Sequence, residues 1–429
     1  MVSSKLLCRV DSATDIEAFA INFPKPYDKY LLVFWYRDVS YGADSFGCTT
    51  LPNIFHWWIL DKTQLTGQTG TAIPHYNLFG NECRAEVLFA NAQFFMRSGL
   101  KLLTSGYVYG GNYQKFVALF DLSDPTKPTL IKELLDVSTP AGGWWNVLRA
   151  LYHPPTDEIY VLSINGDVRY AKYTDFLNAT DFSSLTLVGN LGFSPATGGI
   201  LPFSSGKLMV NASQYGGTGK WNGLLDVSTK TLTRYTSLDA YQGLVSGRKY
   251  LLGLKISDTT LTGIDVIDKT NMSVLRSLTL NIALASQNPW IDLGDYLAQI
   301  VIDGKTFRVI NLTDGSYFDI ILPYPMSGSN FIAGKIYGFN WVSGINTTGE
   351  LYELTLDSYY YLDYDPTTKK AVLKDQAGSP VPNKTVIISK LFAPSRDSGF
   401  EKDVTKTSDA SGVIDLSDIS GVFSITVVG

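Results

Sequence analysis

The chain has 429 residues, of which 45% are hydrophobic and only 17% are charged, and its formal net charge is −5. Soluble domains usually carry roughly 25% charged residues, and here Tyr, Phe and Gly fill the difference, as is typical of β-strands and turns. The acidic balance and the absence of a basic run argue against nucleic-acid binding. The sequence contains no run of about 18 apolar residues, so no membrane span is predicted.

The N-terminal residues MVSSKLLCRVDSATD contain one short apolar stretch, KLLCRV, which Asp11 follows closely. This stretch is too short for the hydrophobic region of a secretory signal peptide, so the sequence predicts none. Residues 4–10 instead resemble a β-strand that has no hairpin partner nearby.

A strand, a polar turn and usually a second strand recur along the chain. The copies lie at 56–67, 119–134, 169–184, 223–238, 263–278, 307–322 and 351–357. A hydrophobic strand precedes each copy, and a further short strand with a tight turn precedes most of these. The repeated unit is therefore four antiparallel strands joined by hairpins, and in the later copies the units lie about 40–45 residues apart.

Four-stranded antiparallel units at this spacing are typical of the blades of a β-propeller. The chain thus resembles an all-β, seven-bladed propeller over residues 1–358, although neither a WD dipeptide nor a kelch glycine pair recurs. We expect residues 4–10 to close the ring as the outer strand of the seventh blade. Asp226, in the copy GLLDVSTKTLTRYTSL, is expected to cap its hairpin turn through its side chain.

Residues 359–429 break the repeat and are predicted to form a second, smaller domain. Two elements of this tail resemble the bacterial immunoglobulin-like modules of invasin-type surface proteins. The matching residues are Asp375, Gly378, Pro380, Val381, Pro382 and Asn383 in the first element, and Thr407, Ser408, Asp409 and Gly412 in the second. The resemblance implies a small β-sandwich that acts as a stalk, spacer or adhesive tip and carries no chemistry. The tyrosine-rich junction 357–370 is expected to hold the two domains together.

Aromatic residues near strand ends form the predicted ligand-binding surface. Hairpin alternation places the loops between the second and third strands of each blade on the same face as the connections between blades. The residues expected there are Tyr41, Tyr113, Trp144, Trp145, Trp221, Trp290 and Trp341. Such a face, weakly charged and flanked by glycine, suits sugar stacking or protein contact. The alternative is that these rings pack between blades as core.

Other candidate features of the sequence are weaker. Cys48 and Cys83 bracket a loop-rich region and could form a disulfide, although three free thiols, Cys8 included, are an equal alternative. Six sequons allow N-glycosylation. They lie at Asn178, Asn211, Asn271, Asn311, Asn346 and Asn383.

No catalytic residue, metal site or cofactor is predicted. His56, His75 and His153 are scattered over two blades, whereas a metal site needs ligands that converge. They are expected to be exposed or hydrogen-bonded. Asp pairs such as Asp121 and Asp124 fall at turns. Two carboxylates from different blades could still meet in the central funnel, as a glycosidase would require.

Three functions are consistent with these features. The first is a non-enzymatic virion spike or tail-fibre component that binds host glycan or protein and contacts other particle proteins through the tail domain. The second is a carbohydrate-active propeller enzyme with an immunoglobulin-like accessory module. The third is a purely structural component of a particle or surface layer. The low charge suggests exposure to an external medium, while no signal peptide is predicted. Together they favour a location on the virion surface or, more broadly, at the cell exterior. Stacking contacts are individually weak, so several rings or several copies of the chain would be needed.

Overall fold

The computed structural model describes most of the chain. The described residues are 2–12, 18–38, 53–67, 73–78, 86–108, 115–136, 149–195, 197–204, 206–214, 217–247, 249–284, 290–292, 295–301, 303–332, 335–342, 347–356, 361–365, 367–375, 378–389, 403–419 and 424–427. Nearly all regular structure in them is β-strand, so the all-β prediction is confirmed.

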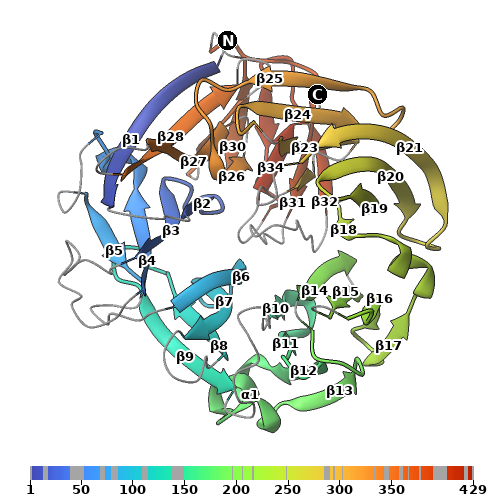
Figure 1. Ribbon diagram of the computed structural model, residues 1–429. Helices are drawn as coiled ribbons and strands as arrows, with labels where there is room; N and C mark the ends of the chain where they lie inside the picture. Colours follow the sequence, from blue (N-terminus) through green and yellow to red (C-terminus); the bar gives the residue numbers. More distant parts are fainter. Residues whose placement is uncertain are drawn as a thin grey trace.

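Seven four-stranded antiparallel sheets are formed by the described residues, and Figure 1 shows them around a ring, in a propeller-like arrangement. The first six sheets follow chain order. They are β2 (Ala18–Asn22), β3 (Tyr30–Asp38), β4 (Asn53–Asp61) and β5 (His75–Asn77); β6 (Glu86–Met96), β7 (Leu100–Val108), β8 (Lys115–Asp121) and β9 (Thr129–Asp136); β10 (Arg149–His153), β11 (Glu158–Leu162), β12 (Asp167–Lys172) and β13 (Thr186–Asn190); β14 (Thr197–Ser204), β15 (Lys207–Ser213), β16 (Lys220–Asp226) and β17 (Thr231–Arg234); β18 (Gly243–Ser246), β19 (Tyr250–Ser257), β20 (Thr260–Asp268) and β21 (Val274–Ala283); and β22 (Ile291–Asp292), β23 (Tyr296–Ile300), β24 (Thr306–Asn311) and β25 (Tyr317–Ile321).

The seventh sheet joins the two ends of the ring. It contains β26 (Ser327–Ile332), β27 (Lys335–Val342), β28 (Thr347–Leu356) and, as its outermost strand, β1 (Val2–Ser12). β1 runs antiparallel to β28 from the pair Val2 and Leu356 to the pair Ser12 and Thr347. Leu7 and Cys8 of β1 are buried in a cluster with residues of the first sheet. The sequence predicted a closing strand at this position, and the structure has one there.

Short polar turns recur where the third strand of a sheet ends. Oδ1 of Asp226 accepts hydrogen bonds from the backbone N–H groups of Ser228, at 2.9 Å, and Thr229, at 3.0 Å. The predicted cap of this hairpin is therefore confirmed. The same contact, to the N–H two residues further on, is made by Asp61, Asp121, Asp268 and Asn311. An Asx-turn of this kind reverses the chain locally, which explains why the motif repeats.

The third sheet departs from the pattern. Residues 169–184 were expected to be a strand, a turn and a second strand. The structure instead places a short helix, α1 (Tyr173–Asn178), after β12, followed by a 3₁₀ turn at Phe182–Ser184. Tyr173 and Phe176 of this segment are buried against the second sheet. β12 ends in Lys172, which cannot form an Asx-turn, and the chain continues into the helix.

Two three-stranded sheets follow the ring. One contains β29 (Tyr361–Asp365), β30 (Lys370–Lys374) and β33 (Val413–Asp415). The other contains β31 (Thr385–Ser389), β32 (Asp403–Thr407) and β34 (Ser424–Val427). They share one core: Leu373 and Ile414 of the first sheet lie in the same buried cluster as Val386 and Ile388 of the second.

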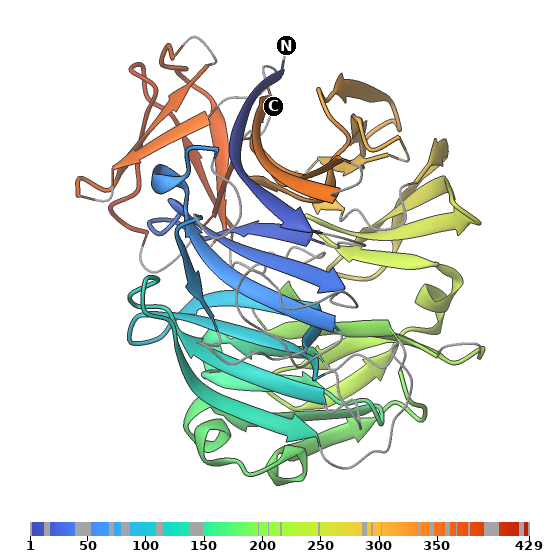
Figure 2. The same ribbon diagram turned by 60° about the vertical axis from the view of Figure 1, so that its left-hand side comes forward.

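These two sheets lie against the ring beside the chain's N-terminal part (Figure 2). β34 contacts β26, and Lys25 Nζ lies 5.5 Å from the ring centroid of Tyr364. The expected packing between the tail and the ring is therefore present in the described residues.

Candidate binding site

One end of the fourth and fifth sheets carries a cavity of about 210 Å³. Its walls are the starts of β10, β14, β16 and β18, the end of β15, and the residues just before β18. This is the face to which the loops between second and third strands and the connections between sheets belong. The cavity thus lies on the face that the sequence predicted for ligand binding.

Strand alternation decides which side chains reach this cavity. Successive residues of a strand point to opposite faces of the sheet. In β16, Lys220 and Asn222 line the cavity next to the fifth sheet, whereas Trp221 packs with Leu151 and Leu162 of the third sheet. The cavity is therefore lined mainly by polar side chains, in place of the predicted aromatic ones.

The predicted aromatic residues are placed differently from one another. Trp221 is 8% exposed and belongs to the core, and its strand β16 begins at Lys220, so Trp221 does not lie in a loop. Trp290 is partly buried against the cluster between the fifth and sixth sheets. Both fit the alternative of packing between blades. Trp341 lies in β27, but its side chain is outside the described residues, as are Tyr41, Tyr113, Trp144 and Trp145.

Hydrogen bonds hold the floor of the cavity in place. The Tyr241 ring lies against Gly253, where an added Cβ would come within 2.5 Å of a ring carbon. Its hydroxyl donates to Asp265 Oδ2 at 2.7 Å, and Lys255 Nζ bonds to Asp265 Oδ1 at 2.6 Å. Burial, followed by the Asp265 carboxylate, raises the pKa of Tyr241, so the phenol stays neutral and donates.

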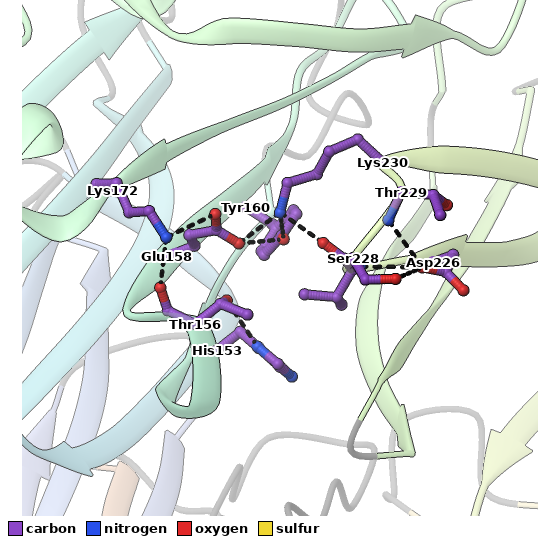
Figure 3. Close-up of polar contacts among 10 residues, drawn as sticks. His153, Thr156, Glu158, Tyr160, Lys172, Asp226, Ser228, Thr229 and Lys230 are labelled. Atoms are coloured by element: carbon purple, nitrogen blue, oxygen red, sulfur yellow. Dashed lines mark hydrogen bonds and ion pairs between the residues drawn. The ribbon is translucent and has the colours of Figure 1, made fainter.

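A second polar cluster joins the third and fourth sheets, at the end of the sheets opposite to the cavity (Figure 3). Glu158, at the start of β11, is 3% exposed and accepts hydrogen bonds at Oε2 from Lys230 Nζ and Tyr160 Oη, each at 2.6 Å. Lys172 Nζ lies 3.1 Å from Oε1. Burial alone would raise the pKa of Glu158, but the bonds from Lys230, Tyr160, Thr156 and Lys172 outweigh it and lower the pKa to about 2.

This Glu158 cluster joins two sheets. Lys230 belongs to the turn between β16 and β17 of the fourth sheet, yet its ammonium also bonds to Tyr160 Oη and lies 4.4 Å from the Tyr170 ring centroid in the third sheet. A carboxylate held at this low pKa by two lysines is a poor proton donor near neutral pH. The geometry is that of a structural ion pair between sheets.

The remaining predicted features have mixed placements. His153 is buried with Nδ1 at 2.9 Å from Thr156 Oγ1 (Figure 3), and His75 Nδ1 lies 2.7 Å from the Ile73 carbonyl. Both are hydrogen-bonded, as expected. The His56 side chain is outside the described residues. Cys8 is a buried free thiol, and burial raises its pKa to about 12.

Cys48 and Cys83 lie outside the described residues, so their pairing stays a prediction. Among the sequon residues, Asn178, Asn271 and Asn383 are exposed, while Asn211 and Asn311 are half-buried. Asn346 lies outside the described residues. Asn211 also lines the cavity. Glycosylation at any of these positions stays a prediction.

Within the part of the chain that the structure describes, no group of three or more His, Cys, Asp or Glu residues could hold a metal ion. The same residues include no helix that is long and apolar enough to cross a membrane.

Comparisons with known proteins identify no family for this chain. No known family matches the sequence, and no curated protein matches it either. Among solved structures, 685 chains match it. One is an uncharacterized protein, lmo1340, of Listeria monocytogenes, with 10% sequence identity and a TM-score of 0.44; the likeness covers 77% of this chain and 91% of that one.

Proposed function

We propose that the chain is a seven-bladed β-propeller, closed by β1, with an immunoglobulin-like module at residues 359–429. Seven sheets of four strands and the pairing of β1 with β28 support the propeller. Two three-stranded sheets around one core support the sandwich. The residues that resemble invasin-type modules lie at its turns: Asp375 Oδ1 accepts from the Ser379 N–H, and Asp409 Oδ1 accepts from the Ser411 N–H.

We infer that this protein is a non-enzymatic, surface-exposed binding protein, a virion spike or tail-fibre component that attaches to a glycan on the host surface. The observation that carries this proposal is the cavity on the loop face. Its described lining offers amide, hydroxyl and cationic groups and includes no carboxylate. Hydrolysis of a glycosidic bond ordinarily needs a pair of carboxylates, so the described lining is suited to holding a sugar and lacks the groups that would cleave it.

The test is a glycan array probed with the full-length labelled protein. We expect reproducible binding to a subset of glycans. Each bound oligosaccharide is then incubated with the protein in solution and weighed by mass spectrometry, and its mass should stay unchanged. Shortened products would identify an enzyme instead. Binding to host cells that protease treatment abolishes, without binding to any glycan, would identify a protein receptor.

The location of the protein is tested separately. Gold-labelled antibody against the full chain should decorate the exterior of purified particles in electron micrographs. The C-terminal module is the proposed contact with other particle proteins, so removing residues 359–429 should release the ring from the particle. Decoration of an internal layer, or retention of the truncated ring, would contradict this assignment.

A further inference from the structure

Two cations line the cavity between the fourth and fifth sheets. Lys220 comes from the start of β16 and Arg149 from the start of β10, and the described lining residues include no Asp or Glu. Around them are neutral polar side chains, among them Asn211, Ser213 and Gln242. The lining therefore combines positive charge with groups that both donate and accept hydrogen bonds.

Lys220 has a fixed position and a charge that no carboxylate in the described residues pairs with. Its Nζ bonds to the backbone carbonyl oxygens of Asp239, at 3.0 Å, and Tyr241, at 3.3 Å. Within the described residues these are its only hydrogen-bond partners. An ammonium group has three N–H donors, so one remains for a ligand, and neutral carbonyls leave the charge in place.

Asp239, whose backbone carbonyl accepts from Lys220, has a carboxylate that is bonded to other groups. Asp239 Oδ2 pairs with Arg234 at 2.7 Å, and Asp239 Oδ1 accepts from Asn222 Nδ2 at 2.9 Å. Arg234 thus neutralises Asp239, and the ammonium of Lys220 keeps its attraction for an anion that enters the cavity.

The side chain of the second cation, Arg149, packs on a glycine of the fourth sheet. An added Cβ at Gly199 of β14 would lie 2.7 Å from Arg149 Cδ, so the arginine stem lies directly on the glycine backbone. A guanidinium is planar and presents two parallel N–H donors that match the two oxygens of a carboxylate. Because Gly199 has no side chain, it leaves room for the Arg149 stem beside the cavity.

We propose that this cavity binds the carboxylate of an acidic sugar, of the uronic-acid or sialic-acid class, between Lys220 and Arg149. The inference rests on the proposed function and gives its ligand class. A volume of about 210 Å³ is below the about 300–1,000 Å³ of pockets that enclose drug-sized ligands, so the cavity suits one sugar unit. The amide and hydroxyl side chains then meet the ring hydroxyls.

The experiment uses the full chain and matched sugar pairs in isothermal titration calorimetry. Glucuronic acid is compared with glucose, and N-acetylneuraminic acid with its methyl ester. We expect each acid to bind and each neutral counterpart to bind at least about tenfold more weakly, because charge-assisted hydrogen bonds are lost. Binding should also weaken as salt increases.

Three variants locate the effect. Lys220→Met should weaken binding of the acid about tenfold or more, whereas Lys207→Met should not, since Lys207 is exposed at the opposite end of the same sheet. Gly199→Ala keeps both charges but displaces the Arg149 stem, and it should weaken acid binding as well. This variant keeps the proposal testable if Lys220→Met fails to fold.

Several outcomes would overturn the inference. Equal binding of neutral and acidic sugars, preference for a sulfated sugar over a uronic acid, or equal affinities of the Lys220→Met and Lys207→Met variants would each do so. In those cases glycan attachment itself would still stand. If no glycan of any kind binds the protein, the inference and the proposed function both fail.

Discussion

Two lysines of the fourth sheet lie at its opposite ends and meet opposite surroundings. Lys230 reaches the third sheet, where its ammonium lies 2.6 Å from the buried carboxylate of Glu158. Lys220 bonds to two backbone carbonyls and lines the cavity beside the fifth sheet. The same residue type therefore completes an ion pair between sheets at one end and leaves a positive charge at a cavity at the other.

Both lysines are half-buried, so the difference shows that the partners of a charge decide its role. Removing one member of a buried pair leaves the other uncompensated and costs about 3–5 kcal/mol, so Lys230 and Glu158 are bound to a structural role. Replacing a lysine that bonds only to neutral carbonyls lowers the stability of the protein less. Such a lysine can bind a ligand, and the protein still folds when it is replaced.

The largest expected effect is on the structural side of this comparison. Lys230→Met should lower the free energy of unfolding by about 3 kcal/mol, near the lower end for a broken buried pair, because Lys172 still contacts Glu158. Urea unfolding followed by tryptophan fluorescence measures it. Lys207→Met is the matched control and should change stability by less than about 0.5 kcal/mol. A similar small change for both would show that the Glu158 cluster is not structural.

The next largest effect is a loss of stability at low pH, which should arise at the Glu158 end of the fourth sheet and not at the Lys220 end. The pKa of Glu158 is lowered from 4.5 to about 2 in the folded state, so its contribution is complete above the unfolded pKa and is lost as the pH falls from about 4.5 toward 2. A shift of this size corresponds to roughly 3 kcal/mol. Unfolding of the protein and of Glu158→Gln, measured from pH 6 to pH 2, should show this loss only in the unsubstituted chain. Parallel curves would contradict the assignment.

A smaller effect is expected at the floor of the cavity. Tyr241→Phe removes the hydroxyl that donates to Asp265 at 2.7 Å, while Lys255 remains to pair with that carboxylate. A hydrogen bond to a charged group contributes about 1.5–3 kcal/mol, so we expect a loss near the lower value, read from the same urea transitions. Tyr235→Phe is a control, because no hydrogen bond of its hydroxyl is seen in the described residues, and it should change little.

Much of the fold could be predicted because its signals are local. An apolar strand that ends in Asp and is followed by Ser or Thr, as at Asp226, encodes a hairpin within a few residues. Repetition of that signal revealed the sheets. The exception, α1 in the third sheet, was missed because the six residues YTDFLN are too few for a helical period to be seen.

The site was harder to predict because it depends on register. Trp221 was assigned to a loop, but β16 begins one residue earlier, and a shift of one residue reverses which face a side chain takes. The register, and with it the face that Trp221 takes, follows from the pairing of Trp221 with Ala212. Likewise, Glu158 and Lys230 are 72 residues apart, and no local pattern brings them together. The one signal in the sequence was that two polar residues, Lys220 and Asn222, flank Trp221 in the chain.

The smallest stability effect is the one that completes the comparison. Lys220→Met breaks only two hydrogen bonds to neutral carbonyl oxygens, at 3.0 and 3.3 Å. Each such bond contributes about 0.5–1.5 kcal/mol, and the unbranched Met side chain retains the apolar contacts of the lysine stem. We expect a loss at the lower end for two such bonds, about 1 kcal/mol in urea unfolding, which is below that of Lys230→Met. If the two variants lose equal stability, Lys220 has a structural role like that of Lys230, and the proposed role of its charge in ligand binding is contradicted.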